Sequence, residues 1–204
     1  MNIPARRLDP ELPNLRPDVV EAYRNAPANI VVEVIDGEPF TMPRPRPRHA
    51  RAMTRLAGRL APFHDPSGED PGGWDILIEP ELYLGTKPDI IDPDVAGWRA
   101  GRLPSAVFTE DASLGIAIVP DWIAEILSPT TERTDRSLKM RVYRREGVAH
   151  VWLLSPMSQT LEVYRLENGR YSLIDTYEGD ARVRVEPFDS IELPLSALWT
   201  VVGP

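Results

Sequence analysis

The stretch "PDWIAEILSPTTERTDRSLKMRVYRREGVAHVWLLS" (120–155) decides the fold that this sequence predicts. Apolar runs at 121–128 and 150–155 are typical of buried strands, and a segment of helical composition at 133–147 lies between them. Gly147 suits the end of that helix, because glycine adopts the left-handed conformation there at little cost. A strand, a crossover helix and a further strand predict that the last strand runs parallel to an earlier one.

The flanking sequence extends this unit in both directions. Helical periodicity at 49–63 and strand patterns at 74–85 and 89–98 give residues 49–155 the order α-β-β-β-α-β. Turn pairs at Asp36-Gly37 and Asn168-Gly169 predict a hairpin on each side of this core, and a short helix is expected at 17–26. We expect a single α/β domain over 1–204 with a mixed α+β sheet, made of a helix and hairpin at 17–42, the core at 49–155 and a β-extension at 160–204.

Composition excludes several classes of protein. The 204 residues are 42% hydrophobic and 26% charged, as in globular proteins, and the absence of cysteine excludes disulfides and thiolate chemistry. The first residues lack the apolar region of a signal peptide, and no run approaches the roughly 20 apolar residues of a membrane span, so a cytoplasmic location is expected. The net charge of −8 argues against a protein that coats nucleic acid without specificity.

Basic residues are nevertheless concentrated in two short segments. Residues 41–64 contain six arginines and no acid, and residues 133–145 contain five arginines, one lysine and a single acid. Segments of this kind are typical either of solvated helix faces or of a surface that contacts phosphates, and the pattern alone leaves both interpretations open.

Two acids lie in apolar strand patterns. Glu125 interrupts "WIAEILS" and Asp94 follows "DIIDP". An unpaired carboxylate in apolar surroundings costs several kcal/mol, so Glu125 is expected to be neutral, paired or bound to a cation. Carboxylates at adjacent strand ends can hold Mg²⁺ or Mn²⁺, because such cations prefer oxygen ligands. The structural alternatives are an ion pair of Glu125 with an arginine and a turn or cap role for Asp94, while Asp92 and Asp121 are expected to face solvent.

Lys139 stands out because the chain contains 21 arginines and only two lysines. It lies in the helix that follows Glu125 and can point back over the sheet. A compact amine can approach a phosphate and can lose its proton when desolvated, whereas a guanidinium stays charged. A metal-bound water beside such a lysine is suited to phosphodiester hydrolysis. The alternative is a surface ion pair with Asp135, four positions earlier.

Together these motifs resemble the Uma-two family of bacterial endonuclease-like proteins, which is related to the PD-(D/E)XK nucleases. The resemblance spans nearly the whole chain. It implies a restriction-endonuclease-like αβββαβ core with added hairpins at both ends. The motifs that carry it are "VIDGEPF" (34–40), the helix opening with His49, "EPELYLG" (79–85), "DPDVAGW" (92–98), the stretch 120–156 and "LEVYRLENGRY" (161–171).

The resemblance also implies a metal site. Pro93-Asp94 matches the PD element of the superfamily, and Glu125 matches the acid of the (D/E)XK element. The backbone carbonyl of Ile126 is implied as a further ligand. The cofactor is then Mg²⁺ or Mn²⁺, held by these three residues.

Two positions depart from the superfamily pattern. Leu127 stands where the superfamily has its lysine, and the Uma-two pattern supplies that lysine from the following helix, here Lys139. The first core helix lacks the Glu that related nucleases often place there, and His49 or Glu81 is the candidate to replace it.

We therefore expect a metal-dependent endonuclease in which Lys139 positions or deprotonates the attacking water, or stabilises the charge that develops on the phosphate. The expected partner is nucleic acid, with DNA favoured, and related nucleases often act as homodimers. The alternatives are a non-catalytic module of this fold that binds a protein or nucleic acid, and a structural domain whose buried acids pair only with arginines. Phosphate contacts are expected at Arg51, Arg55, Arg136 and Arg144.

Overall fold

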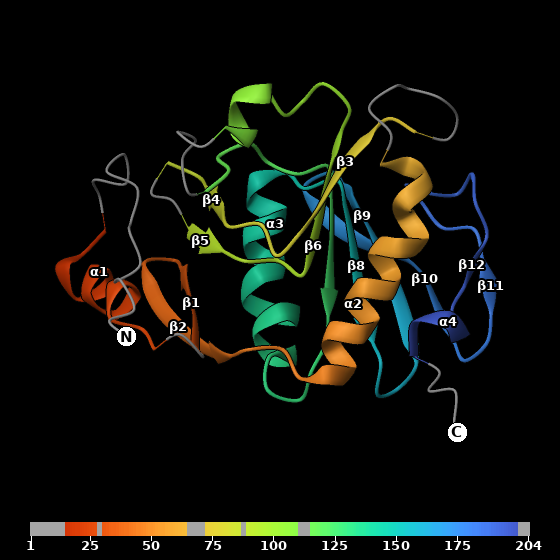
Figure 1. Cartoon of the computed structure of the whole chain (residues 1–204), viewed down its shortest axis with the longest axis horizontal. Coiled ribbons are helices and arrows are strands. Elements are labelled where there is room, and N and C mark those ends of the chain that lie inside the picture. Colours follow the sequence, from red (N-terminus) through yellow and green to blue (C-terminus); the bar gives the residue numbers. More distant parts are fainter. Residues whose placement is uncertain (1–14, 28–29, 65–71, 87–88, 110–114, 200–204) are drawn as a thin grey trace.

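The described part of the chain consists of two large β-sheets, a small two-stranded sheet and the helices packed against them (Figure 1). The computed structural model describes residues 15–27, 30–64, 72–86, 89–109 and 115–199. A six-stranded sheet has the order β10-β9-β8-β7-β6-β3, and a four-stranded sheet has the order β2-β1-β5-β4. The mixed α+β fold that the sequence predicts is confirmed.

The centre of the six-stranded sheet is the parallel strand pair expected from the sequence. β7 (Trp122–Ile126) pairs in parallel with β8 (His150–Ser155). β8 continues into the antiparallel hairpin of β9 (Thr160–Glu167) and β10 (Arg170–Glu178), so the C-terminal hairpin widens the same sheet. All five residues of β7 are buried, which explains why that strand reads as an almost continuous apolar run.

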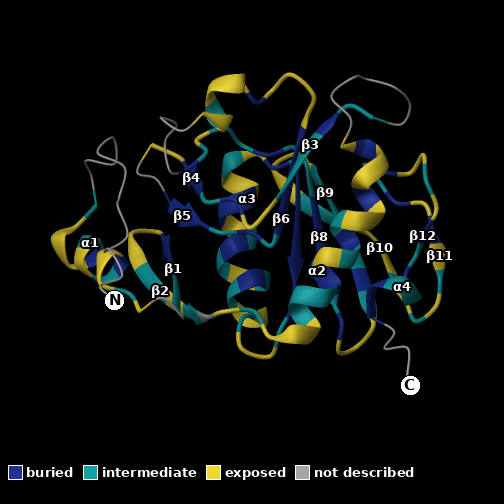
Figure 2. Ribbon diagram, in the orientation of Figure 1, coloured by how far each residue is buried: buried dark blue, intermediate teal, exposed yellow. Residues whose placement is uncertain are grey.

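Different helices cover the two faces of this sheet. α2 (Pro47–Leu60) packs on one face in a buried cluster that contains Trp122 and Trp152. α3 (Met140–Glu146) packs on the other face in a cluster with Ile123. Because side chains alternate along a strand, Glu125 shares the face of Ile123 and points towards α3. Figure 2 shows the buried residues gathered on the central strands, with exposed residues on the outer sides of the helices.

The four-stranded sheet is built around an N-terminal hairpin. β1 (Ile30–Ile35) and β2 (Glu38–Pro43) are antiparallel and are joined at Asp36-Gly37, as predicted. Both turn residues have positive φ, 54° and 80°, which is the geometry that makes Asp-Gly favourable in a two-residue hairpin. α1 (Pro17–Arg24) contacts this hairpin and ends two residues earlier than expected.

The two strands predicted at 74–85 and 89–98 are each broken in two, which corrects the sequence interpretation. β3 (Trp74–Ile78) and β6 (Val95–Arg99) pair in the six-stranded sheet, whereas β4 (Leu82–Leu84) and β5 (Asp89–Ile91) pair in the other sheet. Prolines at 80 and 93 explain the breaks, since proline donates no hydrogen bond to a strand partner. The chain thus crosses between the sheets twice, and Glu79 N–H donates to the Asp94 carbonyl over 3.0 Å at this seam.

The crossover helix begins with an unusual turn. Residues Thr134–Lys139 form a π-helical turn, η3, in which the N–H of Met140 donates to the carbonyl of Asp135, five residues earlier. α3 continues to Glu146, and Gly147 follows with φ 86°, which confirms its predicted role as the helix terminator. A π-turn inside a helix is frequently found at functional sites.

The remaining elements are short, and all but η2 contribute to the packing on the α2 face. They are 3₁₀ turns η1 (Ala61–Phe63) and η2 (Ser105–Phe108), the strand pair β11 (Arg182–Val183) and β12 (Leu193–Pro194), and α4 (Ser196–Trp199). Contacts between α2 and α4 close this side of the molecule. Within the described part of the chain, none of the helices is both long enough and apolar enough to cross a membrane.

Candidate active site

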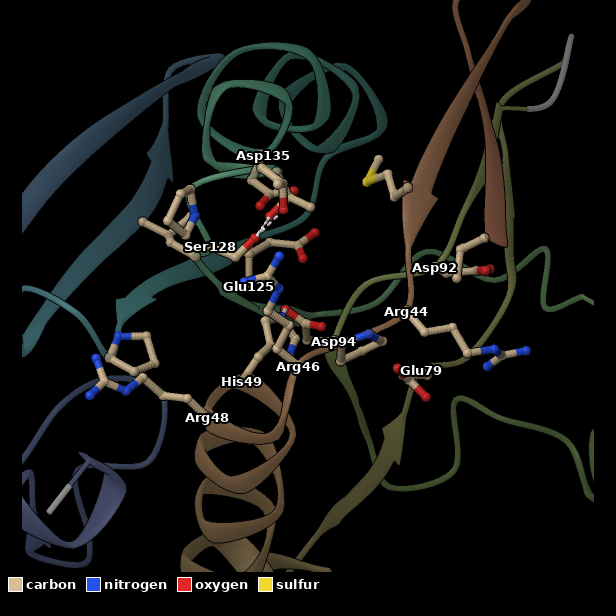
Figure 3. Close-up of a pocket in the computed structure, with 18 of the residues that line it drawn as sticks. Arg44, Arg46, Arg48, His49, Glu79, Asp92, Asp94, Glu125, Ser128 and Asp135 are labelled. Carbon is tan, nitrogen blue, oxygen red and sulfur yellow. Dashed lines mark hydrogen bonds and ion pairs between the residues drawn. The ribbon is translucent and has the colours of Figure 1, made fainter. Parts of the chain in front are cut away.

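A cavity of about 470 Å³ lies where the two sheets meet (Figure 3). Its lining comes from β1, β2, the start of α2, the two chain crossings, the end of β7, and η3. Four of the five residues expected to form the catalytic site line the cavity, namely His49, Asp94, Glu125 and Lys139. The polar lining residues are Glu33, Arg44, Arg46, Arg48, His49, Glu79, Asp92, Asp94, Glu125, Ser128, Thr130, Thr131, Asp135 and Lys139.

The floor of the cavity holds one buried amine among three buried carboxylates, which we call the lysine cluster (Glu33, Glu125, Asp135 and Lys139). The Nζ of Lys139 lies 2.8 Å from Oε1 of Glu33, 3.2 Å from Oε1 of Glu125 and 3.5 Å from Oδ1 of Asp135. The side chain of Lys139 is only 4% exposed. Asp135 and Lys139 therefore do form the pair suggested by their spacing, but inside the cavity and not on the surface.

The electrostatics of the lysine cluster are dominated by burial. Burial raises the pKa of Glu125 well above its usual value, and repulsion by Asp135 and Asp94 adds to this, while Lys139 acts in the opposite direction. Burial also raises the pKa of Glu33 and of Asp135. For Lys139, burial favours a lower pKa, but the charges of Glu125 and Glu33 outweigh it and hold the pKa well above the usual value.

Glu125 is held by more than the lysine. The hydroxyl of Tyr143, one turn further along the helix from Lys139, donates a hydrogen bond to Oε1 of Glu125. Tyr143 itself is fully buried on the α3 face. The residue that interrupts the apolar strand is thus fixed from the crossover helix by two donors, and its partner is a lysine and not an arginine.

Asp94 forms a second polar group beside the cluster. Its Oδ2 accepts a hydrogen bond from the backbone N–H of Ile126 at 2.6 Å and lies 3.2 Å from Nε2 of His49. Burial lowers the pKa of His49, but its hydrogen bond with Asp94 and the charge of Asp94 outweigh this, so the net pKa lies above the usual value. Asp94 therefore ties β6, β7 and α2 together at the edge of the cavity.

The π-turn sets where two members of the cluster lie. Asp135 and Lys139 both belong to η3, and both are buried. Burial raises the pKa of Asp135, and the charge of Lys139 and a hydrogen bond from the side chain of Thr131, in the turn before η3, act against this. The turn thus brings an acid and an amine into the cavity from a single short segment.

The donor set suits a hard divalent cation. Among the described residues, no three His, Asp or Glu side chains stand together as a ready-made metal cage. Mg²⁺ does not need one, because it is commonly held by one or two carboxylates and keeps several waters. Two observations support the fit. Three buried carboxylates face one amine, and Oε2 of Glu33 has no hydrogen-bond partner within the described part of the chain.

Some expected site residues lie elsewhere. Glu81 does not line the cavity, and its carboxylate accepts hydrogen bonds from Tyr23 and from Tyr83, the latter at 2.8 Å. Its position therefore gives no support to a role beside Asp94. His49, the other candidate for that role, does lie in the cavity.

The arginines expected to contact phosphates also lie outside the cavity lining. Arg136 forms a two-pronged ion pair with Glu162, at 2.6 and 2.8 Å, and Arg55 donates to the carbonyl of Ala197 at 2.7 Å. Arg51 is half-buried and Arg144 is exposed on α3. The arginines of the lining come instead from the lead-in to α2 and its first turn, at Arg44, Arg46 and Arg48.

Sequence reasoning missed Glu33, Glu79 and Asp92. Asp92 is half-buried in the lining and its N–H donates to Glu33 at 3.0 Å, which corrects the expectation that Asp92 faces solvent. Glu33 carried a usable signal, because it interrupts the apolar run "IVVEVI" just as Glu125 interrupts its own strand. Asp121, the other acid expected at a strand end, bonds to Arg102 and to the N–H of Arg99.

The fold and the site together define a protein with a nuclease-like fold and a polar, acid-lined cavity. A crystal structure described as "a putative nuclease belonging to DUF820", from Anabaena variabilis ATCC 29413, is similar to this chain with a TM-score of 0.66. The two share 24% sequence identity over 83% of this chain and 89% of that chain.

The family assignment follows from the sequence match. The model of the Uma2 family, whose description is "Putative restriction endonuclease", matches residues 19–196. The chain belongs to the Uma2 family. The resemblance seen in the sequence motifs is thereby confirmed. No curated protein matches the chain.

Proposed function

We propose that the protein is a metal-dependent endonuclease that hydrolyses phosphodiester bonds in nucleic acid at the cavity between the sheets. The proposal depends on one observation, which is that three residues from separate parts of the chain line the same cavity. Glu125 on β7 and Lys139 on η3 lie 3.2 Å apart, and Asp94 from the chain crossing lines the same cavity. The assignment to the Uma2 family supports the same class of reaction.

Asp94 and Glu125, with the carbonyl of Ile126, would hold Mg²⁺ or Mn²⁺. When bound, the cation supplies a polarised water and neutralises charge on the phosphate. Asp94 is already positioned for this by the Ile126 N–H and by His49. Glu125 is positioned by Tyr143.

Lys139 acts as a fixed positive charge in this proposal. Its amine is held within 3.5 Å of three carboxylates, so it is directed into the cavity and kept from swinging out. A charge in that place stabilises the negative charge that builds up on the phosphate during hydrolysis. Of the roles open to Lys139 from the sequence, positioning the water and stabilising charge fit these contacts better than removal of a proton.

The test is metal-dependent cleavage of single- and double-stranded DNA and RNA by the wild type and by three variants. Asp94→Asn, Glu125→Gln and Lys139→Arg should each lower the cleavage rate by at least about 10²-fold, the scale for losing one positioned group in a reacting site. Glu178→Gln, an exposed carboxylate at the end of β10, is the matched control and should cleave at the wild-type rate.

Cleavage by Glu125→Gln at the wild-type rate would reject the proposed site. Absence of cleavage by the wild type with either metal on all four substrates would reject hydrolysis and leave a binding module of this fold.

A further inference from the structure

Three arginines follow the cavity along its length. Arg44 and Arg46 lie in the extended lead-in to α2, and Arg48 lies in the first turn of that helix. Figure 3 shows Arg48 and Arg44 extending towards opposite sides of the view, with Arg46 and the acids Asp94 and Glu125 between them. All three arginines are exposed, so their charges lie at the rim of the cavity while the acids lie below.

The start of α2 adds to this positive rim. Arg48 and His49 form the first turn of a 14-residue helix, and that turn contains no acid. The N–H groups of a first helical turn have no partners within the helix, and the helix dipole is positive there. A phosphate that follows the arginine row therefore also meets the N-terminus of α2.

Part of the cavity lining is apolar. Pro129, Pro156 and Met157 belong to the lining, and Met157 is 65% exposed. Among the described residues of the lining there is no Phe, Tyr or Trp. These apolar side chains can pack against a base of any kind, but they offer no aromatic ring on which a base can stack.

The acids of the lysine cluster lie deep in the cavity. Glu33 and Glu125 are each only 1% exposed. A phosphodiester must therefore enter the cavity to reach a cation held by Asp94 and Glu125. The cavity volume of about 470 Å³ is that of a site for one small ligand, which is the size range of a single nucleotide.

We propose that the substrate of this site is an unpaired nucleic-acid strand, laid along residues 44–48 with one nucleotide inside the cavity. This inference rests on the proposed function for its chemistry. The arginines contact successive phosphates, the acids face the scissile phosphate, and Pro129, Pro156 and Met157 contact a base. A base-paired strand does not fit this arrangement, because Glu125 is only 1% exposed and a duplex is too wide to enter a cavity of about 470 Å³. Enzymes that act on buried positions in nucleic acid solve the same problem by taking an unpaired or flipped-out nucleotide.

The same arrangement fixes the character of binding. Arginines that neutralise phosphates make affinity fall with salt, and for a single strand each phosphate that is no longer neutralised reduces the slope of log affinity against log salt by about 0.7. The arginines are expected to contact phosphates, which carry no sequence information, so binding through them should be tolerant of sequence.

The test measures binding and cleavage separately on the same substrates. Binding of a labelled single strand, the matching blunt duplex and a duplex with an unpaired overhang is measured by fluorescence anisotropy in EDTA, where no metal-dependent turnover occurs. Cleavage of the same set is then measured with Mg²⁺ or Mn²⁺. DNA and RNA versions of each substrate separate the two kinds of strand.

We expect the single strand to bind at least about tenfold more tightly than the duplex, a difference of about 1.4 kcal/mol. Arg46→Gln and Arg48→Gln should each reduce the salt slope by about 0.7. Arg59→Gln is the matched control, because Arg59 is an exposed arginine in the last turn of the same helix and does not line the cavity. With metal, cuts should fall in unpaired segments.

Equal or tighter binding of the blunt duplex, or duplex cleavage as fast as that of the single strand, would overturn the inference while leaving the proposed hydrolysis standing. An unchanged salt slope in both arginine variants would overturn it as well. The experiment also distinguishes a protein that binds a single strand but does not cleave it. Single-strand binding that depends on Arg46 and Arg48, without cleavage under any metal, would support the strand site and reject the proposed hydrolysis.

Discussion

Two charged clusters join the N-terminal hairpin to the crossover helix, and they differ in their access to water. The lysine cluster places one amine among three carboxylates, with Lys139 only 4% exposed. The second, which we call the arginine cluster, joins Asp36 and Asp89 to Arg141 and Arg145, with Glu146 at its edge. Its arginines are about half exposed, at 57% and 47%.

The difference shows which cluster can be explained as ion pairs that only stabilise the fold. In the arginine cluster every guanidinium has a carboxylate partner and water reaches both arginines, so an imbalance of charge is screened. In the lysine cluster the surplus of carboxylates is buried, where charge without compensation is costly. Among the ion pairs of the described residues, lysine occurs only at this buried position, and the exposed pairs are formed by arginine. The buried surplus is what a cation would compensate.

The largest effect is expected from removing the amine. Lys139→Met leaves three buried carboxylates facing one another, and the free energy of unfolding without metal should fall by about 3–5 kcal/mol, the scale for breaking a buried pair. Arg141→Met, in the arginine cluster, should cost less than about 1 kcal/mol, since its pair with Asp36 is exposed. Urea denaturation at neutral pH compares the two. Equal stability of Lys139→Met and wild type would mean that the carboxylates already bind protons.

A double variant tests the same charge surplus. If Lys139→Met fails because of crowded carboxylates, adding Glu33→Gln should restore about 1–2 kcal/mol, within the range measured for contacting residues. The glutamine can still accept the N–H of Asp92. Glu132→Gln, an exposed acid just before η3, is the control and should restore nothing. Denaturation of the four proteins of the cycle gives the coupling, and a coupling near zero would contradict the description of the cluster.

Glu125→Gln should separate metal binding from folding. The change relieves carboxylate crowding, so the metal-free protein should be as stable as wild type or more stable. Wild type should gain about 2.7 kcal/mol at a metal concentration 100 times the Kd, and the variant should gain none. Thermal unfolding with and without Mg²⁺ or Mn²⁺ measures both quantities.

The matched variant in the other cluster is Asp89→Asn. It breaks the ion pair with Arg145 and should lower stability, yet it should keep the metal-dependent gain. A metal-dependent gain that survives in Glu125→Gln, or disappears in Asp89→Asn, would place the cation elsewhere.

The smallest effect concerns a pair on the other side of η3. Hydrogen bonds from Arg136 hold the pKa of Glu162 below its usual value, with a smaller contribution from Tyr164. A lowered pKa in the folded state gives stability that is present above the unfolded-state pKa, about 4.3, and is lost as pH falls through the folded-state pKa. Glu162→Gln should therefore be less stable than wild type at pH 7, with a difference that shrinks towards pH 3. A difference that grows on acidification would refute this sign.

The sequence predicts the elements that depend on local pattern. The parallel pair of β7 and β8, both hairpin turns and the glycine stop at Gly147 all follow from residues close together in the chain. Glu125, Asp94, Lys139 and His49 were identified from their own surroundings and the family motif, and the structure brings them to one cavity.

The parts that the sequence could not predict depend on contacts between distant segments. The strand pattern at 74–85 continues across a break at Glu79, although its half-buried first part and its buried second part belong to different sheets. Glu33 lies far from the core in sequence, and only the packing of the hairpin against η3 brings it to Lys139. The pairing of Arg136 with Glu162 is equally non-local. The sequence of the arginine-rich helix therefore does not indicate which of its arginines already have an acidic partner.

The π-turn makes the length of one short segment matter as much as its composition. A π-turn holds one residue more than an α-helical turn of the same path, and each residue of an α-helix turns the chain by about 100°. α3 is anchored to the sheet by Val142 and Tyr143. Loss of any one codon from 136 to 138 would therefore give a regular α-helix with Lys139 in place and the residues before it rotated about the helix axis. Asp135 would leave the cavity without being mutated, so a reading frame that stays intact can still disable the site.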